Sequence, residues 1–194
     1  MNTDFIKGVV VPMITPIDKD ELIDEAAIRS QVDYVIDGGV SGILLFGSNG
    51  EFYVVEEDEM ERGLKIVVDQ AAGRVPVYFG IGAISTKKCI RLAKMAVANG
   101  AASVSVLQPM FLKPTETELF THFKAIADAI PETPVLLYNN PGRVGYTLSA
   151  NLVDRLAHEV PNIVGMKDTS GDITQTSEFI RRNRDVDFKV FGGK

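Results

Sequence analysis

The stretch Gly42-Ile43-Leu44-Leu45-Phe46 is apolar from its first residue to its last. A strand with one solvated face alternates apolar and polar side chains, whereas a strand covered on both faces is apolar throughout. These five residues therefore predict a strand that is buried on both sides. Strands of that kind are typical of parallel sheets that carry helices on their faces.

Six more short, mainly apolar runs flank this stretch, and longer segments with helical periodicity separate them. The predicted strands are Gly8–Ile14, Gly42–Phe46, Val75–Phe79, Ser103–Leu107, Val135–Tyr138, Ile163–Met166 and Phe188–Phe191. The predicted helices lie near 24–38, 56–72, 86–99, 115–129, 149–158 and 173–183. Strand starts recur about every 25 to 34 residues, the size of one βα unit. The alternation predicts repeated βαβ units and a parallel sheet.

Residues that cap helices mark several of these boundaries. Asp24 precedes the first predicted helix, and Ser85 or Thr86 precedes the third. Thr115 is followed three residues later by Glu118, which is the spacing of a capping box. We expect these side chains to accept hydrogen bonds from the first free amides of each helix.

Seven alternating strands fit either an eightfold barrel or an open doubly wound sheet. Doubly wound dinucleotide-binding sheets carry a glycine-rich turn after the first strand, but here that strand continues into Pro12-Met13-Ile14-Thr15-Pro16. The pattern favours a (β/α)8 TIM barrel, forming one domain over residues 1–194. A complete barrel takes about 250 residues, so we expect about seven strands and six helices, without the eighth strand and the helices after it. Either the sequence is a piece of a longer protein, or the barrel needs another chain to close.

The composition excludes several classes of protein. The net charge of −6 argues against a nucleic-acid partner, because phosphate binding needs clustered Lys and Arg. No run of about eighteen apolar residues indicates a membrane span, and the start Met1-Asn2-Thr3-Asp4 lacks the regions of a secretion signal. Cys89 is the only cysteine and has no partner for an internal disulfide. A cytoplasmic protein is the expectation.

Neither histidine has the neighbours of a metal ligand. His122 and His158 both lie in predicted helices, with no carboxylate cluster at ligand spacing around them. Cys89 falls inside the third helix, where packing is its expected role. The sequence therefore predicts no metal site.

Lys167 follows the apolar run Asn162–Met166, and in a barrel the functional side chains lie at such C-terminal strand ends. Burial disfavours the charged ammonium form of a lysine, and a neutral amine can attack a ketone to form an imine. The alternative is a lysine that pairs with Asp168 or extends to solvent. Tyr138 ends the neighbouring fifth run, about 4.8 Å away across the sheet. Its phenol could move protons to and from a lysine adduct, or it could be an interior or interface aromatic.

Two further candidates could bind an anionic substrate. The turn Gly47-Ser48-Asn49-Gly50-Glu51 follows the second strand, and its two glycines would let backbone amides converge on a carboxylate. Arg143 lies on the predicted loop after the fifth strand, and its planar guanidinium suits a carboxylate. Taken singly, an ordinary turn and a solvated surface arginine are the alternatives.

Together these motifs resemble the dihydrodipicolinate synthase / N-acetylneuraminate lyase family, over essentially the whole chain. Gly47-Ser48-Asn49-Gly50-Glu51 resembles the family's Gly-Ser/Thr-x-Gly-Glu turn, which holds the pyruvate carboxylate. Tyr138-Asn139-Asn140-Pro141 is similar to its Tyr-Asn-x-Pro segment, whose tyrosine is the general acid/base. Gly165-Met166-Lys167-Asp168-Thr169-Ser170-Gly171-Asp172 looks like the segment of the Schiff-base lysine.

The resemblance implies a class I lyase or aldolase that needs no cofactor and acts on pyruvate, or a 2-oxo acid yielding pyruvate, together with an aldehyde. Lys167 would form the imine, Tyr138 would transfer protons, and Ser48 would position Tyr138. The residues that would bind substrate are Gly47, Asn49, Gly50 and Arg143. The family resemblance also implies a homo-oligomer, a dimer or a tetramer built from dimers.

The sequence departs from the family pattern after the fourth strand. Dihydrodipicolinate synthases have Thr-Pro-Tyr-Tyr there, and the second tyrosine completes a proton relay across the dimer interface. This chain has Gln108-Pro109-Met110-Phe111, and a phenylalanine cannot carry a proton. Asn49 also replaces the second threonine of the Gly-Thr-Thr-Gly turn. Arg143, in contrast, matches the arginine that binds aspartate semialdehyde, which neuraminate lyases tend to lack.

Three functions therefore stay open within the hypothesis of a Schiff-base barrel. The first is condensation of pyruvate with aspartate semialdehyde, which Phe111 disfavours. The second is an aldolase or dehydratase for 2-keto-3-deoxy sugar acids, which Arg143 disfavours. The third is a non-catalytic barrel that binds 2-oxo acids without turnover.

Overall fold

The computed structural model describes residues 1–194 and contains seven strands and seven α-helices. The strands are β1 (Val10–Pro12), β2 (Gly42–Leu45), β3 (Val77–Ile81), β4 (Ser103–Leu107), β5 (Val135–Asn139), β6 (Ile163–Asp168) and β7 (Lys189–Gly192). The helices are α1 (Glu25–Asp37), α2 (Glu57–Ala71), α3 (Thr86–Ala98), α4 (Glu116–Asp128), α5 (Pro141–Val144), α6 (Ala150–Glu159) and α7 (Ile173–Arg182). A short 3-10 turn, η1 (Ser48–Gly50), follows β2.

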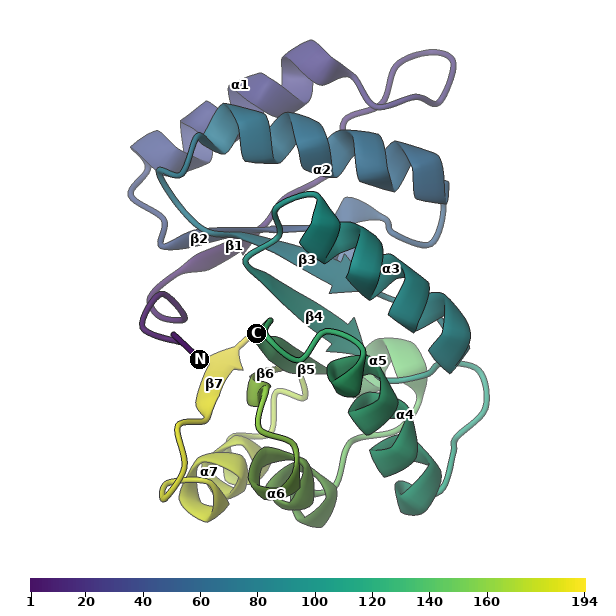
Figure 1. The fold of residues 1–194 in the computed structure, drawn as a ribbon, viewed down its shortest axis with the longest axis vertical. Helices are drawn as coiled ribbons and strands as arrows, with labels where there is room; N and C mark the ends of the chain where they lie inside the picture. The colour runs from purple at the N-terminus through teal and green to yellow at the C-terminus, as the bar shows by residue number, and fades with distance from the viewer.

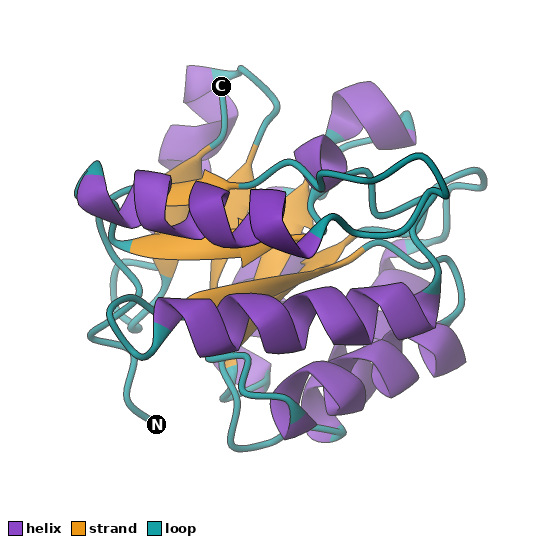
Figure 2. Ribbon diagram, turned by 90° about the horizontal axis from the view of Figure 1, so that it is seen from above, coloured by secondary structure: helices purple, strands orange, loops and turns teal.

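The strands form one parallel sheet in chain order, β1 to β7, and the helices pack around its outside (Figures 1 and 2). Every strand contributes to the lining of one interior cavity of about 360 Å³. These lining residues include Val10, Leu44, Tyr78, Ser105, Leu136, Lys167 and Phe191. A sheet whose seven strands line one cavity must curl around it, as in a barrel. The structure thus confirms seven strands of a (β/α)8 barrel, with β1 and β7 each paired on one edge only.

Two apolar cores lie on the two faces of the curled sheet. The larger, of 42 buried residues, fills the space between the sheet and the helices. The smaller lies inside the barrel and consists of Ile6, Leu44, Tyr78, Leu136 and Val164. Residues of β2 are divided between the two cores, with Leu44 inside and Ile43 and Leu45 outside. This division explains why the run 42–46 has no polar position.

Several element boundaries differ from the sequence-based expectation. β3 runs from Val77 to Ile81 instead of starting at Val75, because Pro76 has no amide hydrogen for the ladder. β6 continues through Lys167 and Asp168, so Lys167 lies within the strand and does not follow it. Polar side chains end the apolar pattern at Met166, but backbone hydrogen bonding does not depend on side-chain polarity.

A seventh helix, α5, also lies where a loop was expected. Pro141 occupies its N1 position, where the fixed φ of proline suits a helix start. Arg143 therefore sits on a one-turn helix and not on a loop. The other six helices lie where the sequence predicts them.

The predicted caps are present. The side chains of Asp24 and Ser85 accept hydrogen bonds from the amides of Ala27 and Lys88. Thr115 forms a capping box with Glu118. The N-cap of the third long helix is thus Ser85 and not Thr86.

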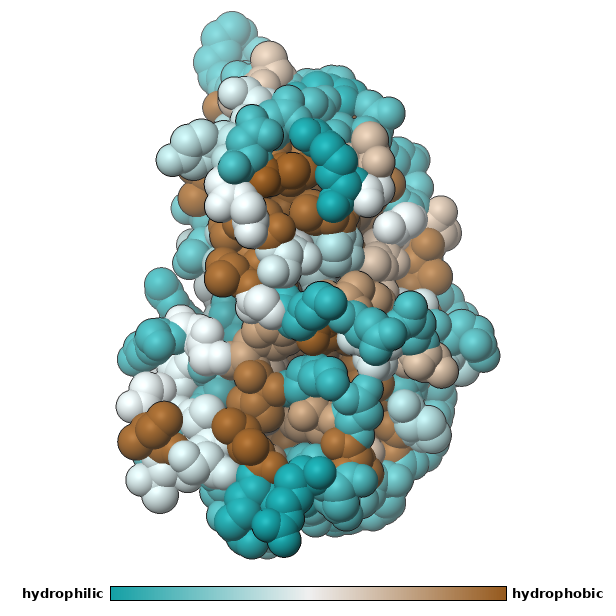
Figure 3. All heavy atoms as spheres, turned by 90° about the vertical axis from the view of Figure 1, so that its left-hand side faces the viewer, coloured by the Kyte–Doolittle hydropathy of each residue, from teal (hydrophilic) through white to brown (hydrophobic).

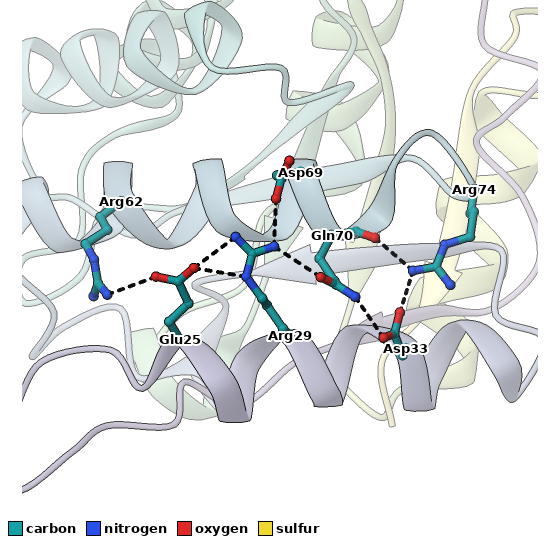
Figure 4. Close-up of polar contacts among 7 residues, drawn as sticks. All are labelled: Glu25, Arg29, Asp33, Arg62, Asp69, Gln70 and Arg74. Carbon is teal, nitrogen blue, oxygen red and sulfur yellow. Dashed lines mark hydrogen bonds and ion pairs between the residues drawn. The ribbon is translucent and has the colours of Figure 1, made fainter.

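On the outer surface, α1 and α2 are joined by a network of polar side chains (Figure 4). Arg29 on α1 contacts Asp69 on α2 at 2.7 Å. Asp33 on α1 accepts hydrogen bonds from Gln70 and from Arg74, just beyond α2. The hydrogen bond from Arg74 lowers the pKa of Asp33 below its usual value. Because these groups are exposed to solvent, each pair adds little to stability and mainly fixes how the two helices align.

The face with the N-terminal segment and β7, on the left of Figure 1, shows apolar patches between hydrophilic ones (Figure 3). The segment before β1 crosses this side, where Phe5 and Phe191 pack against the inner core. None of the helices combines the length and apolar character that crossing a membrane would require.

Gly80 allows β2 and β3 to approach each other closely. A Cβ atom at this position would lie 2.5 Å from the carbonyl oxygen of Phe46. We expect Gly80→Ala to lower the free energy of unfolding by about 2 kcal/mol, because backbone atoms must move apart. In the control Gly192→Ala, where a Cβ meets nothing within 4 Å, the change should stay within about 0.5 kcal/mol. Urea unfolding measures both, and equal losses would contradict the steric argument.

His122 on α4 should make stability depend on pH. Its Nδ1 atom lies 2.8 Å from Thr86 Oγ1, and its Nε2 atom is buried without a partner. Burial lowers the pKa of His122 from 6.5 to about 4. Because the folded-state pKa lies below the unfolded one, the stabilising contribution is complete above pH 6.5 and lost as the pH falls through about 4.

When the pH is lowered from neutral to about 4, the free energy of unfolding of the parent chain should fall. We expect it to fall by about 2 kcal/mol less in His122→Gln. Urea unfolding at both pH values measures the difference. His158 is the matched control, since the Asp154 carbonyl, with further help from Asp185, raises its pKa. The stabilising contribution of His158 is present below the unfolded-state pKa and lost as the pH rises through the folded-state pKa. Lowering the pH should therefore cost His158→Gln more stability than it costs the parent chain, the opposite of His122→Gln. An unchanged profile in His122→Gln would refute this assignment.

Candidate active site

Lys167 and Tyr138 occupy paired positions on adjacent strands. The parallel register of β5 and β6 pairs Tyr138 with Lys167, and Asn139 with Asp168. The Nζ atom of Lys167 lies 4.8 Å from the centroid of the Tyr138 ring. Lys167 is half-buried and lines the interior cavity, whereas Tyr138 is 6% exposed. The lysine predicted to carry the chemistry is thus directed into the barrel beside the predicted tyrosine.

Ser48 reaches the same point from β2. Its Oγ atom lies 3.2 Å from the Tyr138 hydroxyl. The amide nitrogen Nδ2 of Asn140 donates a second hydrogen bond to that hydroxyl at 2.7 Å. The Tyr138 oxygen is therefore held by two side chains, one from the turn after β2 and one from the residue after β5.

The turn that carries Ser48 obtains its shape differently from the sequence-based expectation. Gly47 has an extended backbone, and the left-handed conformations fall on Phe46 (φ 51°) and Glu51 (φ 53°). Gly50 is needed for close packing, because a Cβ atom there would lie 3.0 Å from the carbonyl oxygen of Met13. Left-handed backbone at non-glycine residues is unfavourable and persists only where surrounding contacts enforce it. One such contact is the hydrogen bond from Thr15 Oγ1 to the Gly50 carbonyl, 2.6 Å long.

Asp168, next to Lys167, points away from the cavity and is 3% exposed. Its carboxylate accepts hydrogen bonds from Asn139 Nδ2 at 2.9 Å, from the amide of Ser170 at 3.1 Å and from the Ser170 hydroxyl at 2.9 Å. The Thr176 hydroxyl on α7 donates a further one. Because adjacent residues of a strand face opposite sides, fixing Asp168 outside directs Lys167 inside. Lys167 and Asp168 therefore do not form the ion pair that was the alternative for Lys167.

The segment after β7 passes close beside Lys167. A Cβ atom at Gly193 would lie 2.8 Å from Lys167 Cε, and the Gly193 amide donates to the Asp168 carbonyl at 2.8 Å. Gly193 thus leaves room for the lysine side chain where a larger residue would displace it.

Other predicted substrate-binding residues lie further out. Asn49 is exposed in η1, and its side chain makes no hydrogen bond within the chain. Arg143 is exposed on α5, and its guanidinium forms no ion pair or hydrogen bond. Neither side chain forms a hydrogen bond with Lys167, Tyr138 or Ser48, so their roles stay predictions.

Phe111 projects into solvent from the loop after β4. It is 92% exposed, and its φ of 81° is a conformation that bulky residues rarely adopt. The ring lacks a hydroxyl and contributes no hydrogen bond to Tyr138.

His122 and His158 both lie away from the site, on α4 and α6. Cys89 is buried inside α3, where burial raises the pKa of its thiol to about 11. No group of three or more His, Cys, Asp or Glu residues could hold a metal ion.

Sequence reasoning missed three residues that shape the site: Gln108, Asn140 and Asp168. Asn140 and Asp168 each belong to a predicted motif, but the sequence does not show which way either side chain faces. Gln108, at the end of β4, is fully buried and accepts a hydrogen bond from the Asn140 amide at 3.1 Å. A buried glutamine directly after an apolar run was the available signal, because buried polar groups need partners.

The chain matches the model of the dihydrodipicolinate synthetase family over residues 5–194. It belongs to this family. Among curated relatives, it is 38% identical over 187 residues to the 4-hydroxy-tetrahydrodipicolinate synthase of Salinibacter ruber, covering 96% of the chain and 61% of the relative. It is 40% identical to the synthase of Nitrosospira multiformis, covering 100% and 63%.

Solved structures of the family agree in fold. The dihydrodipicolinate synthase of Acinetobacter baumannii, complexed with pyruvate, aligns with a TM-score of 0.92 at 37% identity, covering 97% of this chain and 64% of the other. YagE, a prophage protein of the same family from E. coli K12 in complex with pyruvate, also gives 0.92, at 31% identity, covering 96% and 63%. The chain thus spans 61% to 64% of the length of these relatives.

Asp168→Ala should destabilise the chain strongly, because it leaves several buried donors without an acceptor. We expect the free energy of unfolding to fall by about 3 kcal/mol. Asp128 is the matched control, since it is exposed on α4 and paired only with Lys124. Asp128→Ala should change stability by at most about 0.5 kcal/mol. Urea denaturation compares the two, and a small effect of Asp168→Ala would show that the buried network does not hold the end of β6.

Proposed function

We propose that this chain carries the imine-forming site of a class I lyase or aldolase that acts on pyruvate or on a 2-oxo acid yielding pyruvate. The observation that carries the proposal is the group formed by Lys167, Tyr138 and Ser48. The Lys167 amine lines the cavity, the Tyr138 ring lies beside this amine, and the Ser48 hydroxyl is within hydrogen-bond distance of the Tyr138 hydroxyl. Family membership supports the same reaction class, as do the pyruvate complexes of the Acinetobacter and E. coli relatives.

The proposed reaction begins when the Lys167 amine attacks the ketone carbon of pyruvate. Loss of water from the resulting carbinolamine gives an imine, which withdraws electrons from the neighbouring methyl group. Removal of a methyl proton then gives an enamine, whose carbon forms a bond to the aldehyde carbon. Hydrolysis of the final imine releases the product and restores the amine, so no external oxidant, reductant or cofactor is needed.

Tyr138 is the proposed proton carrier for these steps. Its ring lies 4.8 Å from Lys167 Nζ, and the hydrogen bond with Ser48 holds its hydroxyl in position. A positioned acid or base of this kind typically contributes about 10² to 10⁴ in rate. Ser48 and Asn49 begin η1, and amides at the start of a helical turn have no acceptor within it. We propose that these amides, flanked by Gly47 and Gly50, hold the substrate carboxylate, and that Arg143 meets the second substrate.

Reductive trapping tests the imine. Incubation of the 194-residue chain with pyruvate and borohydride should add the mass of one reduced pyruvate, mapped to Lys167. Lys167→Ala should form no adduct, whereas Lys124→Ala, which removes a half-buried lysine paired with Asp128 on α4, should react like the parent chain. An adduct of equal yield in Lys167→Ala would end the proposal.

The same chain can then be assayed for the three open functions. Turnover with aspartate semialdehyde favours the activity named for the curated relatives. Cleavage or dehydration of 2-keto-3-deoxy sugar acids favours a sugar-acid aldolase or dehydratase. An adduct without turnover on either substrate favours a 2-oxo-acid-binding barrel. A homo-oligomeric assembly and a cytoplasmic location stay predictions from the sequence.

A further inference from the structure

We infer that Asn140 is a positioning residue that holds the Tyr138 hydroxyl, so that both hydrogen-bond partners of this hydroxyl come from its own chain. The inference deepens the proposed function and rests on it for its catalytic meaning. The observation behind it is the 2.7 Å hydrogen bond from Asn140 Nδ2 to the Tyr138 oxygen, in a position where asparagine usually does something else.

Asn140 occupies the N-cap of α5, where an asparagine side chain normally accepts a hydrogen bond from the first turn of the helix. Here it makes no capping hydrogen bond. The side chain turns back to the tyrosine two residues earlier. The side-chain amide of Asn140 thus binds Tyr138 and does not cap α5.

The surroundings hold Asn140 in this position. It is 9% exposed, and its main-chain amide donates to Gln108 Oε1 at 3.1 Å. Gln108 is anchored in turn, because its Nε2 donates to the Tyr146 carbonyl at 2.6 Å. The Asn140 carbonyl accepts from the amides of Arg143 and Val144 in α5. With its backbone fixed on both sides, the Asn140 side chain loses little freedom when it binds the phenol.

The direction of the hydrogen bond determines what Tyr138 can do. Because the amide nitrogen can only donate, the Tyr138 oxygen accepts. The phenol proton is then available to Ser48 Oγ, 3.2 Å away, or to a substrate atom. Donation from the amide also stabilises negative charge on the phenol oxygen after the proton leaves. Asn140 therefore assists release of the proton.

This arrangement accounts for the absence of a hydroxyl at Phe111. Phe111 is exposed and apolar, and a second hydrogen-bond partner for Tyr138 is supplied by Asn140. Gln108 stands in the segment after β4 that departs from the family pattern, and a hydrogen bond joins it to Asn140 after β5. The two residues therefore form one structural unit. Within this chain, the Tyr138 hydroxyl already has two hydrogen-bond partners, Ser48 and Asn140.

Carbon NMR tests the contact without turnover. Tyrosine is labelled at Cζ, and the Tyr138 resonance is assigned as the one missing in Tyr138→Phe. Asn140→Leu, which keeps the side-chain size but removes the donor, should shift this resonance. The matched control Asn151→Leu changes an exposed asparagine on α6 and should leave it in place. An unmoved Tyr138 resonance in Asn140→Leu overturns the inference, whether or not the chain reacts with pyruvate.

Exchange of the pyruvate methyl protons with D2O tests the effect on proton transfer. Asn140→Leu should slow exchange by roughly tenfold to a hundredfold relative to the parent chain, while Asn151→Leu stays within about twofold. In Asn140→Asp the carboxylate accepts and cannot donate, so exchange is slow at neutral pH. As the pH falls from about 8 toward 5 and the carboxyl begins to protonate, the ratio of its rate to the parent rate should rise.

The outcomes separate the two proposals. Equal slowing of Asn140→Leu and Asn140→Asp at every pH indicates a structural role and overturns the inference. Absence of a Lys167 adduct in the parent chain ends the proposed function, and the Tyr138 resonance still decides whether Asn140 holds the hydroxyl.

Discussion

The parallel ladder between β5 and β6 is the constraint on which the rest of the site depends. It places Tyr138 opposite Lys167 and Asn139 opposite Asp168. Since neighbouring residues of a strand face opposite sides, one register directs Lys167 into the cavity with Tyr138 beside it, and the anchoring pair outward. A shift by one residue would exchange them, leaving a carboxylate inside and the lysine in the outer core. The buried hydrogen bonds of Asp168 oppose such a shift, and their loss would affect the site and the fold together.

The sequence predicted the parts of this protein that depend on local pattern. Gly42–Phe46 indicated a strand covered on both faces, and Thr115 with Glu118 indicated a helix start, because these signals arise within one element. It also predicted that Lys167 and Tyr138 would lie side by side, since they end neighbouring strands of a parallel sheet, whereas the contact of Ser48 with Tyr138 was implied by the family resemblance. Residues that act through contacts between elements were not predictable in the same way. The Asn140 main-chain amide donates to Gln108 on the loop after β4, and Gln108 is anchored by the Tyr146 carbonyl, so neither contact follows from the local pattern. The left-handed backbone fell on Phe46 and Glu51 and not on the nearby glycines, because tertiary contacts imposed it.

Membership of the dihydrodipicolinate synthetase family and the geometry of the site support each other at different levels of detail. The family match and the structural likeness concern the barrel as a whole. The contacts among Lys167, Tyr138 and Ser48 concern the reaction class. Neither level fixes the aldehyde, because Arg143, the residue proposed to meet it, is exposed on α5. The chemistry of the imine is thus tied to the interior of the barrel, and the choice of second substrate to its surface.

At position 140, at the start of α5, the side chain that best stabilises the helix differs from the one that holds Tyr138. A helix of four residues with no side-chain cap is weakly held at its first turn. Selection for stability would favour a side chain at position 140 that accepts hydrogen bonds from that turn, as aspartate or serine does. Such a side chain would turn away from the tyrosine. Evolution or engineering toward a more heat-resistant chain is therefore expected to meet a stability–activity trade-off at this residue.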